Sequence, residues 1–305
     1  MRTMKLGSSG LEVPVIAVGC MRINSVDKAG AEKLVRTALE AGLNFFDHAD
    51  IYGGGTCESI FADAIHMNDS IREKIILQSK CGIRKERYDF SKQHILEAVD
   101  GSLKRLKTDY LDVLLLHRPD PLMEPDEVAE ALDILKNSGK VRNFGVSNQK
   151  PMQIELLKKS VKQPIVANQL QLSIAHAGMI SNGVNVNMET PAAVDRDGSV
   201  LDYCRLNDIT IQAWSPFQYG FFEGVFLNRD KFPELNRAID KVAANYGVSN
   251  TAIALAWILR HPARIQPVTG TMNPDRLKEC AKAADIRLTR EEWYEIYRAA
   301  GNDIP

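Results

Sequence analysis

Residues 92–117 read KQHILEAVDGSLKRLKTDYLDVLLLH and contain two different periodicities. In the first part apolar residues recur every three or four positions behind Ser91, a candidate N-cap, which predicts a helix over Lys92–Leu106. The second part, Leu111–Leu116, is apolar except for Asp112, which is typical of a strand that is buried on both faces. A capped helix followed by such a strand indicates the repeating unit of a parallel α/β sheet.

The same alternation extends along the whole chain. The predicted strands are Val15–Val18, Leu43–Phe46, Ile75–Gln78, Leu111–Leu116, Asn143–Val146, Ile165–Asn168, Thr210–Ala213 and Ile265–Val268. Readable helices lie between them, such as Asp27–Ala41 with Gly42 as its stop. Another is Asp126–Asn137, with Pro125 near its first turn and Gly139 just past its end.

Eight βα units with no Pro/Gly/Ser-rich linker between halves favour one (β/α)8 barrel over two domains with an open sheet. We therefore expect residues 1–305 to form a single α/β domain. Met4–Leu6 and Leu11–Val13 predict a hairpin that plugs the barrel bottom, and Arg290–Ala300 predicts a further helix after the eighth unit. Two long connections, Ser173–Ser199 and Phe217–Phe232, are expected to fold over the active face.

The composition is that of an ordinary globular protein. Of the residues, 45% are hydrophobic and 25% charged, and 38 Lys and Arg against 39 Asp and Glu give a net charge of −1. This balance argues against a nucleic-acid-binding surface, and no apolar run is long enough to span a membrane. Five scattered cysteines suit a reducing compartment. We expect a cytoplasmic protein, as a monomer or weak homo-oligomer.

Polar residues follow the predicted strands, where the fold would gather them at one mouth. Asp47, Tyr52, Lys80 and His117 stand out because they supply an acid of tunable strength. A phenol with a pKa near 10 donates a proton poorly at neutral pH, and a nearby ammonium lowers that pKa. Asp47 would hold the Lys80 charge, and His117 would orient a carbonyl oxygen. Such a set protonates an oxygen while its carbon receives a hydride or a nucleophile.

The chain resembles the aldo-keto reductases. The matching fragments are Lys5-Leu6-Gly7, Ser9-Gly10-Leu11, Gly19, NFFDHADIYG (44–53), Lys80, YLDVLLLH (110–117), Gly139–Arg142, FGVSN (144–148), Trp214-Ser215-Pro216 and Gly270–Arg276. This resemblance implies a (β/α)8 barrel that binds NADPH, with NADH as the alternative, and reduces a small aldehyde or ketone. It also places Asp47, Tyr52, Lys80 and His117 on the catalytic tetrad, with Tyr52 as general acid.

The resemblance also implies a set of cofactor-binding residues. Ser147, Asn148 and Gln169 match groups that bond the nicotinamide carboxamide, and Trp214 matches the aromatic residue stacked on the ring. The remaining positions are Gly19, Cys20, Met21, Asp47, Ser215, Pro216, Phe217, Gly270, Thr271, Met272, Asn273, Arg276, Glu279 and Cys280. Independently, the segment from Gly270 opens a helix, and free backbone N–H groups at a helix N-terminus bind phosphates. Arg276, in that first turn, is the expected partner of a 2′-phosphate.

Other interpretations stay open at this point. Lys80 could form a Schiff base in an aldolase, or the chain could be a cofactor-sensing subunit with little turnover. A metal site at His48 and Asp50 beside His117 is disfavoured, because two ligands of alternating direction make a poor site. No metal is therefore expected.

Overall fold

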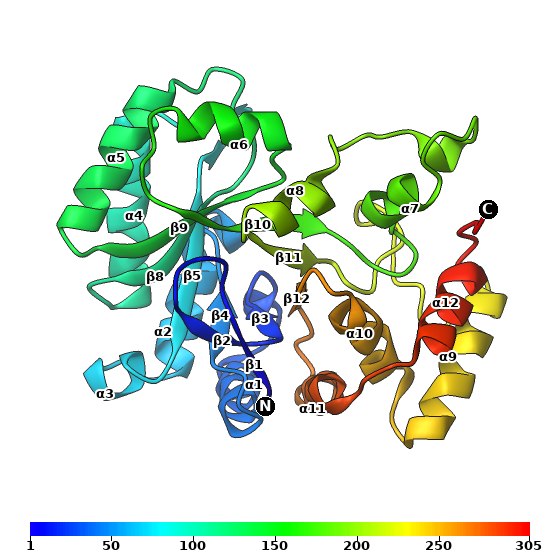
Figure 1. Cartoon of the computed structure of the whole chain (residues 1–305). Helices are drawn as coiled ribbons and strands as arrows, with labels where there is room; N and C mark the ends of the chain where they lie inside the picture. The colour runs from blue at the N-terminus through cyan, green and yellow to red at the C-terminus, as the bar shows by residue number, and fades with distance from the viewer.

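Eight parallel strands close into a barrel in the computed structural model, which describes residues 1–305 (Figure 1). Around the barrel they are β3 (Ala17–Gly19), β4 (Phe45–Asp47), β5 (Ile76–Cys81), β8 (Leu111–Leu116), β9 (Val141–Ser147), β10 (Ile165–Gln171), β11 (Thr210–Trp214) and β12 (Gln266–Thr269). β12 pairs with β3 and closes the ring. The predicted (β/α)8 barrel is confirmed, and each predicted run overlaps one strand.

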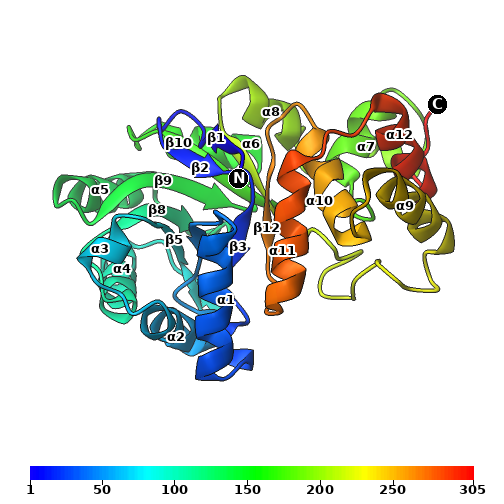
Figure 2. The ribbon, with the colours of Figure 1, turned by 90° about the horizontal axis from the view of Figure 1, so that it is seen from below.

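Helices surround the barrel. They are α1 (Lys28–Glu40), α2 (Thr56–Ala64), α3 (Asp69–Arg72), α4 (Lys92–Leu106), α5 (Pro125–Asn137), α6 (Pro151–Lys158), α7 (Gly178–Val184), α8 (Val200–Leu206), α9 (Pro233–Tyr246), α10 (Asn250–Arg260), α11 (Pro274–Lys282) and α12 (Arg290–Ala299). α1 and α11, from opposite ends of the chain, lie side by side (Figure 2). No helix by itself is long and apolar enough to cross a membrane; only α9 and α10 together, bent by 93°, meet that length and composition.

The predicted caps and stops form as the sequence indicates. The Ser91 side chain accepts a hydrogen bond from the His94 amide and begins α4. Gly42 and Gly139, each one residue past the C-cap residue of α1 or α5, have φ of +74° and +76°, a conformation in which a side chain would be strained. α12 is the predicted additional helix, and it packs against α9 (Figure 1).

The predicted hairpin covers the N-terminal end of the barrel. β1 (Thr3–Lys5) pairs antiparallel with β2 (Glu12–Pro14). Val13, on β2, and Leu6, directly after β1, are fully buried in one apolar cluster with residues from six barrel strands. The barrel bottom is therefore closed by side chains, and ligands have access only at the other end.

The connections differ from expectation in two places. Ser173–Ser199 contains α7 and the 3-10 turn Pro191–Ala193, and none of its residues lines the cavity at the barrel mouth. The prediction that this segment folds over the active face holds at its start, where the Ser173 hydroxyl donates to the carbonyl oxygen of the cavity residue Gln218 at 2.6 Å. It is wrong for α7, which contacts α8 and whose Ser181 accepts a hydrogen bond from Tyr297 of α12. After β5, a hairpin of β6 (Ile83–Arg84) and β7 (Arg87–Tyr88) was not predicted.

Candidate active site

Three of the predicted catalytic side chains form one hydrogen-bonded group at the strand ends. Lys80, on β5, is completely buried, and its Nζ lies 2.8 Å from the Asp47 carboxylate on β4. The same Nζ donates to the His48 carbonyl oxygen at 2.8 Å and to the Tyr52 hydroxyl oxygen at 3.0 Å. An ammonium has three N–H donors and no acceptor. All three are used here, so the Tyr52 hydroxyl keeps its own proton free to donate to another acceptor.

Charge and burial act in opposite directions on this group. Burial raises the pKa of Tyr52 and the adjacent ammonium lowers it, and the net direction is upward. Burial lowers the pKa of Lys80, but Asp47 and Tyr52 raise it further, so its net direction is also upward. Lys80 lowers the pKa of the phenol as predicted, but desolvation raises it by more. Tyr52 is therefore protonated, and Lys80 charged, at neutral pH.

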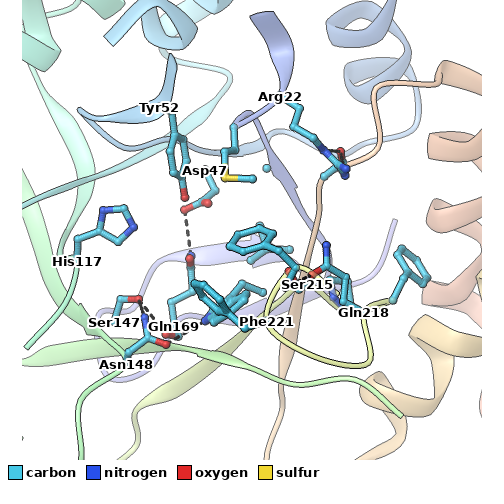
Figure 3. A pocket seen from close by; sticks show the side chains of 18 of the residues that line it. Arg22, Asp47, Tyr52, His117, Ser147, Asn148, Gln169, Ser215, Gln218 and Phe221 are labelled. Atoms are coloured by element: carbon cyan, nitrogen blue, oxygen red, sulfur yellow. Dashed lines mark hydrogen bonds between the residues drawn. The ribbon is translucent and has the colours of Figure 1, made fainter. Parts of the chain in front are cut away.

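His117, at the end of β8, completes the group. Its ring lies 5.9 Å from the Tyr52 ring, nearly perpendicular to it, on the same side of the cavity (Figure 3). Burial lowers the pKa of His117 far below its ordinary value, and the charges of Lys80 and Arg118 add to this effect. The imidazole is therefore neutral, with one N–H to donate and no net charge.

A glycine turn sets the position of Tyr52. The 3-10 turn Tyr52–Gly55 contains Gly53, Gly54 and Gly55 with φ of +58°, +65° and +92°. A Cβ on Gly53 would come within 2.6 Å of the Thr56 hydroxyl oxygen. Three consecutive residues in this region are accessible to glycine at little cost, so the sequence can reverse direction here and return Tyr52 to the barrel mouth.

Four buried glutamines connect the Asp47 carboxylate to the bottom of the barrel. Asp47 Oδ1 accepts from Gln78 at 2.6 Å and from Gln169 at 3.0 Å (Figure 3 shows the Gln169 bond). Both amide nitrogens also donate to Gln212, which donates to Gln266, whose amide reaches the Pro14 carbonyl at 2.7 Å. The register explains this chain, since Gln169, Gln212 and Gln266 are partners on neighbouring strands. It supplies two hydrogen bonds that hold the carboxylate against Lys80.

We predict that Gln78→Met lowers the free energy of unfolding by about 1.5–3 kcal/mol, because a hydrogen bond to a buried carboxylate is lost. Gln93→Met, at an exposed position on α4, should change it by less than about 0.5 kcal/mol. Urea unfolding measures both. Equal effects of the two substitutions would contradict a stabilising role for the glutamine chain.

A cavity of about 740 Å³ opens above this group. Of the predicted site residues, those that line it are Gly19, Met21, Asp47, Tyr52, His117, Ser147, Asn148, Gln169, Trp214, Ser215, Pro216, Phe217, Gly270, Thr271 and Arg276. Phe217–Phe232 contributes Phe217, Phe221 and Phe222, as predicted for that segment. Cavities of this size suit small-molecule ligands.

One wall of the cavity is a relay of polar side chains. Trp214 Nε1 donates to Asn148 Oδ1 at 3.1 Å, and Asn148 donates to the Ser147 hydroxyl at 2.7 Å (Figure 3 shows the latter bond). The Ser147 hydroxyl in turn donates to the backbone carbonyl of Gln169 at 3.0 Å. Asn148 and Ser215 both have positive φ, at +56° and +52°. A non-glycine residue held at positive φ strains the folded state, and such residues cluster at functional sites. The strands thus fix the predicted nicotinamide-binding residues relative to one another.

The neighbouring part of the wall, after β12, differs from expectation. α11 begins at Pro274, and the Asn273 side chain accepts from the Asp275 and Arg276 amides. The expectation that these amides are free for phosphate is wrong, because Asn273 caps them. The Arg276 side chain does line the cavity, next to a smaller hollow of about 110 Å³.

Six predicted site residues do not line the cavity. They are Lys80, Cys20, Met272, Asn273, Glu279 and Cys280. Lys80 lies directly below it, bonded to Tyr52. Cys20 and Cys280 are buried, and Glu279 pairs with Lys282. All five cysteines are free thiols. No cluster of three or more His, Cys, Asp or Glu side chains is arranged to bind a metal ion.

Asp50, just beyond β4, is an unusual neighbour of the group. Its Oδ1 is buried without a partner, and burial, with the Glu58 charge, raises the pKa of Asp50 to about 7 from 3.8. The native protein therefore binds a proton that the unfolded chain releases between pH 4 and 7, so stability falls as pH rises through this window. Relative to wild type, Asp50→Asn should raise the free energy of unfolding by about 1–2 kcal/mol more at pH 8 than at pH 5. Urea unfolding at the two pH values measures this difference. An equal gain in the free energy of unfolding at pH 5 and pH 8 would contradict the prediction.

Sequence reasoning missed several residues here. Gln78, Gln212 and Gln266 are amides inside otherwise apolar strands, and Gln78 and Gln212 stand two positions before Lys80 and Trp214. That period-2 spacing places them on the inward face and could have revealed them. Arg22 and Arg118 also line the cavity. Each follows a predicted strand-end residue, so it could have been included in the site.

Comparisons with known proteins identify the family of the chain. The model of the aldo/keto reductase family matches residues 15–300. The chain is 37% identical to the uncharacterised oxidoreductase YcsN of Bacillus subtilis (94% of both chains) and 37% identical to a 6-dehydroglucose reductase of Novosphingobium aromaticivorans (99% of this chain, 96% of the relative). A thermostable aldo-keto reductase solved with the inhibitor epalrestat superposes with a TM-score of 0.79 at 27% identity, covering 98% of this chain and 100% of that one. The chain belongs to the aldo/keto reductase family of oxidoreductases.

Proposed function

We propose that the protein reduces aldehydes or ketones to alcohols with NADPH as its preferred cofactor. The observation that carries this proposal is the 3.0 Å hydrogen bond from Lys80 to the Tyr52 hydroxyl oxygen at the cavity floor. It leaves the phenol proton for a carbonyl oxygen, while the neutral His117 donates its N–H to the same oxygen and orients it. As that proton departs, the Lys80 ammonium, held by Asp47, stabilises the developing phenolate.

The residues around the cavity fit a nicotinamide cofactor, which when bound supplies the hydride to the carbonyl carbon. The Gln169 side chain uses only its Nε2 in hydrogen bonds within the protein, so its Oε1 is available to a carboxamide N–H. Ser147 and Asn148 would bind the rest of the carboxamide, and Trp214 would stack on the ring. Ser215, Pro216 and Phe217 would cover the pyrophosphate, and Arg276 would bind the 2′-phosphate.

The geometry argues against a Schiff-base aldolase. A nucleophilic lysine must be deprotonated and reach its substrate. Lys80 has an exposure of 0%, all three of its protons are donated, and its pKa is raised. Each of these features disfavours attack on a carbonyl carbon.

NADPH consumption with a panel of aldehydes and ketones tests the proposal. The panel should include 6-dehydroglucose, because one relative is named for its reduction. Aldehyde-dependent oxidation of NADPH with formation of the alcohol is expected. Tight NADPH binding, seen by quenching of its fluorescence, with no turnover on the panel would instead favour a cofactor-sensing subunit.

We predict that Arg276→Ala raises the Michaelis constant for NADPH by about tenfold or more and that for NADH much less, since only NADPH offers a 2′-phosphate to the guanidinium. Steady-state kinetics with both cofactors measure the two constants. Equal increases in the Michaelis constants for NADPH and NADH would show that Arg276 does not bind the 2′-phosphate.

A further inference from the structure

Arg118 lines the cavity directly after His117, yet its charge has no acidic partner. Its guanidinium carbon lies 5.8 Å from the ring centres of Trp214 and Phe221. The nearest acid in the sequence, Asp120, accepts hydrogen bonds from the Phe90 and Leu122 amides instead. The guanidinium donors therefore remain for a ligand.

The cavity itself holds no free negative charge. Asp47 is its only acidic lining residue, and both carboxylate oxygens of Asp47 lie 2.8 Å from Lys80 Nζ. The Arg118 guanidinium lies beside two aromatic rings and is partly removed from water, so an anion that enters the cavity would stabilise it. The missing counter-charge is therefore expected to come from a bound molecule.

Barrel topology separates Arg118 from the two other arginines of the cavity. Arg118 follows β8, which lies four strands away from β12 in the ring of eight and so on the opposite side. Arg276 follows β12, and Arg22 donates to the Gly270 carbonyl oxygen at 2.6 Å on that same side. Cofactor phosphates are proposed for the β12 side. Arg118 is left to the substrate.

The surroundings of Arg118 indicate the class of substrate. Ile51, Ile83, Tyr88 and Phe221 give this cavity apolar surface, and the planar guanidinium fork matches a carboxylate in a bidentate pair. We propose that Arg118 selects carbonyl substrates that carry a carboxylate on an apolar or aromatic body. This inference rests on the proposed reductase function and adds the part of the substrate that is recognised.

Two probes of nearly equal size test it: 4-formylbenzoate and its uncharged methyl ester, each with NADPH. We expect the wild-type kcat/KM to be at least about tenfold higher for the acid, because only the acid can form the ion pair. Arg118→Met should lower kcat/KM for the acid by about 10- to 100-fold and for the ester by less than about threefold. Arg118→Lys keeps the charge but cannot form the bidentate pair, so its kcat/KM for the acid should lie between those of wild type and Arg118→Met.

Lys85→Met is the matched control. Lys85 is exposed in the turn between β6 and β7 and does not line the cavity, so this variant removes one positive charge near the mouth without touching the proposed contact. Lys85→Met should keep the ratio of kcat/KM for the acid to kcat/KM for the ester within about twofold of the wild-type ratio. A chain-length series of ω-carboxy aldehydes would then measure the separation between carbonyl and carboxylate.

Unchanged acid-to-ester selectivity in Arg118→Met would overturn the inference, and so would an equal loss on both probes. Reduction of the ester by that variant also shows that it is folded. If the wild-type protein reduced neither probe nor any member of the carbonyl panel, the proposed function itself would fail. Robust reduction of neutral carbonyls with no preference for the acid would overturn only the role of Arg118.

Discussion

Tyr52→Phe should lower kcat for carbonyl reduction by roughly 10²- to 10⁴-fold, the usual contribution of a positioned proton donor. Lys80 donates to the Tyr52 oxygen, so the phenol proton is the one that can point toward a substrate. Phenylalanine keeps the ring and removes only this donor. The dissociation constant of NADPH should change little, which fluorescence titration would check.

Tyr88→Phe supplies the control for this substitution. Tyr88, on β7, also lines the cavity and would lose the same hydroxyl group, but it has no contact with Lys80. Its kcat should stay within about threefold of wild type. If Tyr52→Phe kept kcat within tenfold as well, Tyr52 would not be the acid.

Lys80→Met should both inactivate and destabilise the protein. Removing one partner of a buried ion pair leaves an uncompensated charge, which costs about 3–5 kcal/mol of folding free energy. Asp47 would be that charge, at 2% exposure. The activity should fall by at least about 10²-fold, since the ammonium no longer stabilises the developing phenolate.

A double variant separates these two effects. Asp47→Asn combined with Lys80→Met removes both charges, so the free energy of unfolding should recover by about 2 kcal/mol or more relative to Lys80→Met alone. The activity should not recover, because the lysine charge is still missing. Recovery of reduction in the double variant would show that Lys80→Met acts only through stability.

Much of the architecture could be predicted because the strands are short apolar runs with turn residues at their ends. The Ser91 cap and the stops at Gly42 and Gly139 depend on neighbouring residues only, and all three hold in the structure. The position of α7 depends on contacts with α8 and α12, which sequence periodicity does not contain. The two-residue strands β6 and β7 are too short for a periodicity to appear.

In the site, too, the features set by strand position could be predicted, and those set by side-chain packing could not. Asp47, Lys80 and His117 stand at strand ends, and a closed barrel brings strand ends to one mouth, so their proximity could be predicted. The cap of Asn273 on α11 depends on a side-chain rotamer, and sequence alone left its amides free. The upward pKa of Tyr52 depends on desolvation outweighing the Lys80 charge, which requires the actual depth of burial.

The most direct test of the account follows the hydride itself. The protein would be given NADPH deuterated at C4 of the dihydronicotinamide, on one face at a time, with an aldehyde that it reduces, and the alcohol analysed by mass spectrometry. The account predicts one deuterium on the carbinol carbon from one of the two labelled faces, and none on that carbon when unlabelled NADPH is used in deuterated water. An alcohol that carried no cofactor deuterium from either face, or that took its carbon-bound deuterium from the solvent, would contradict it.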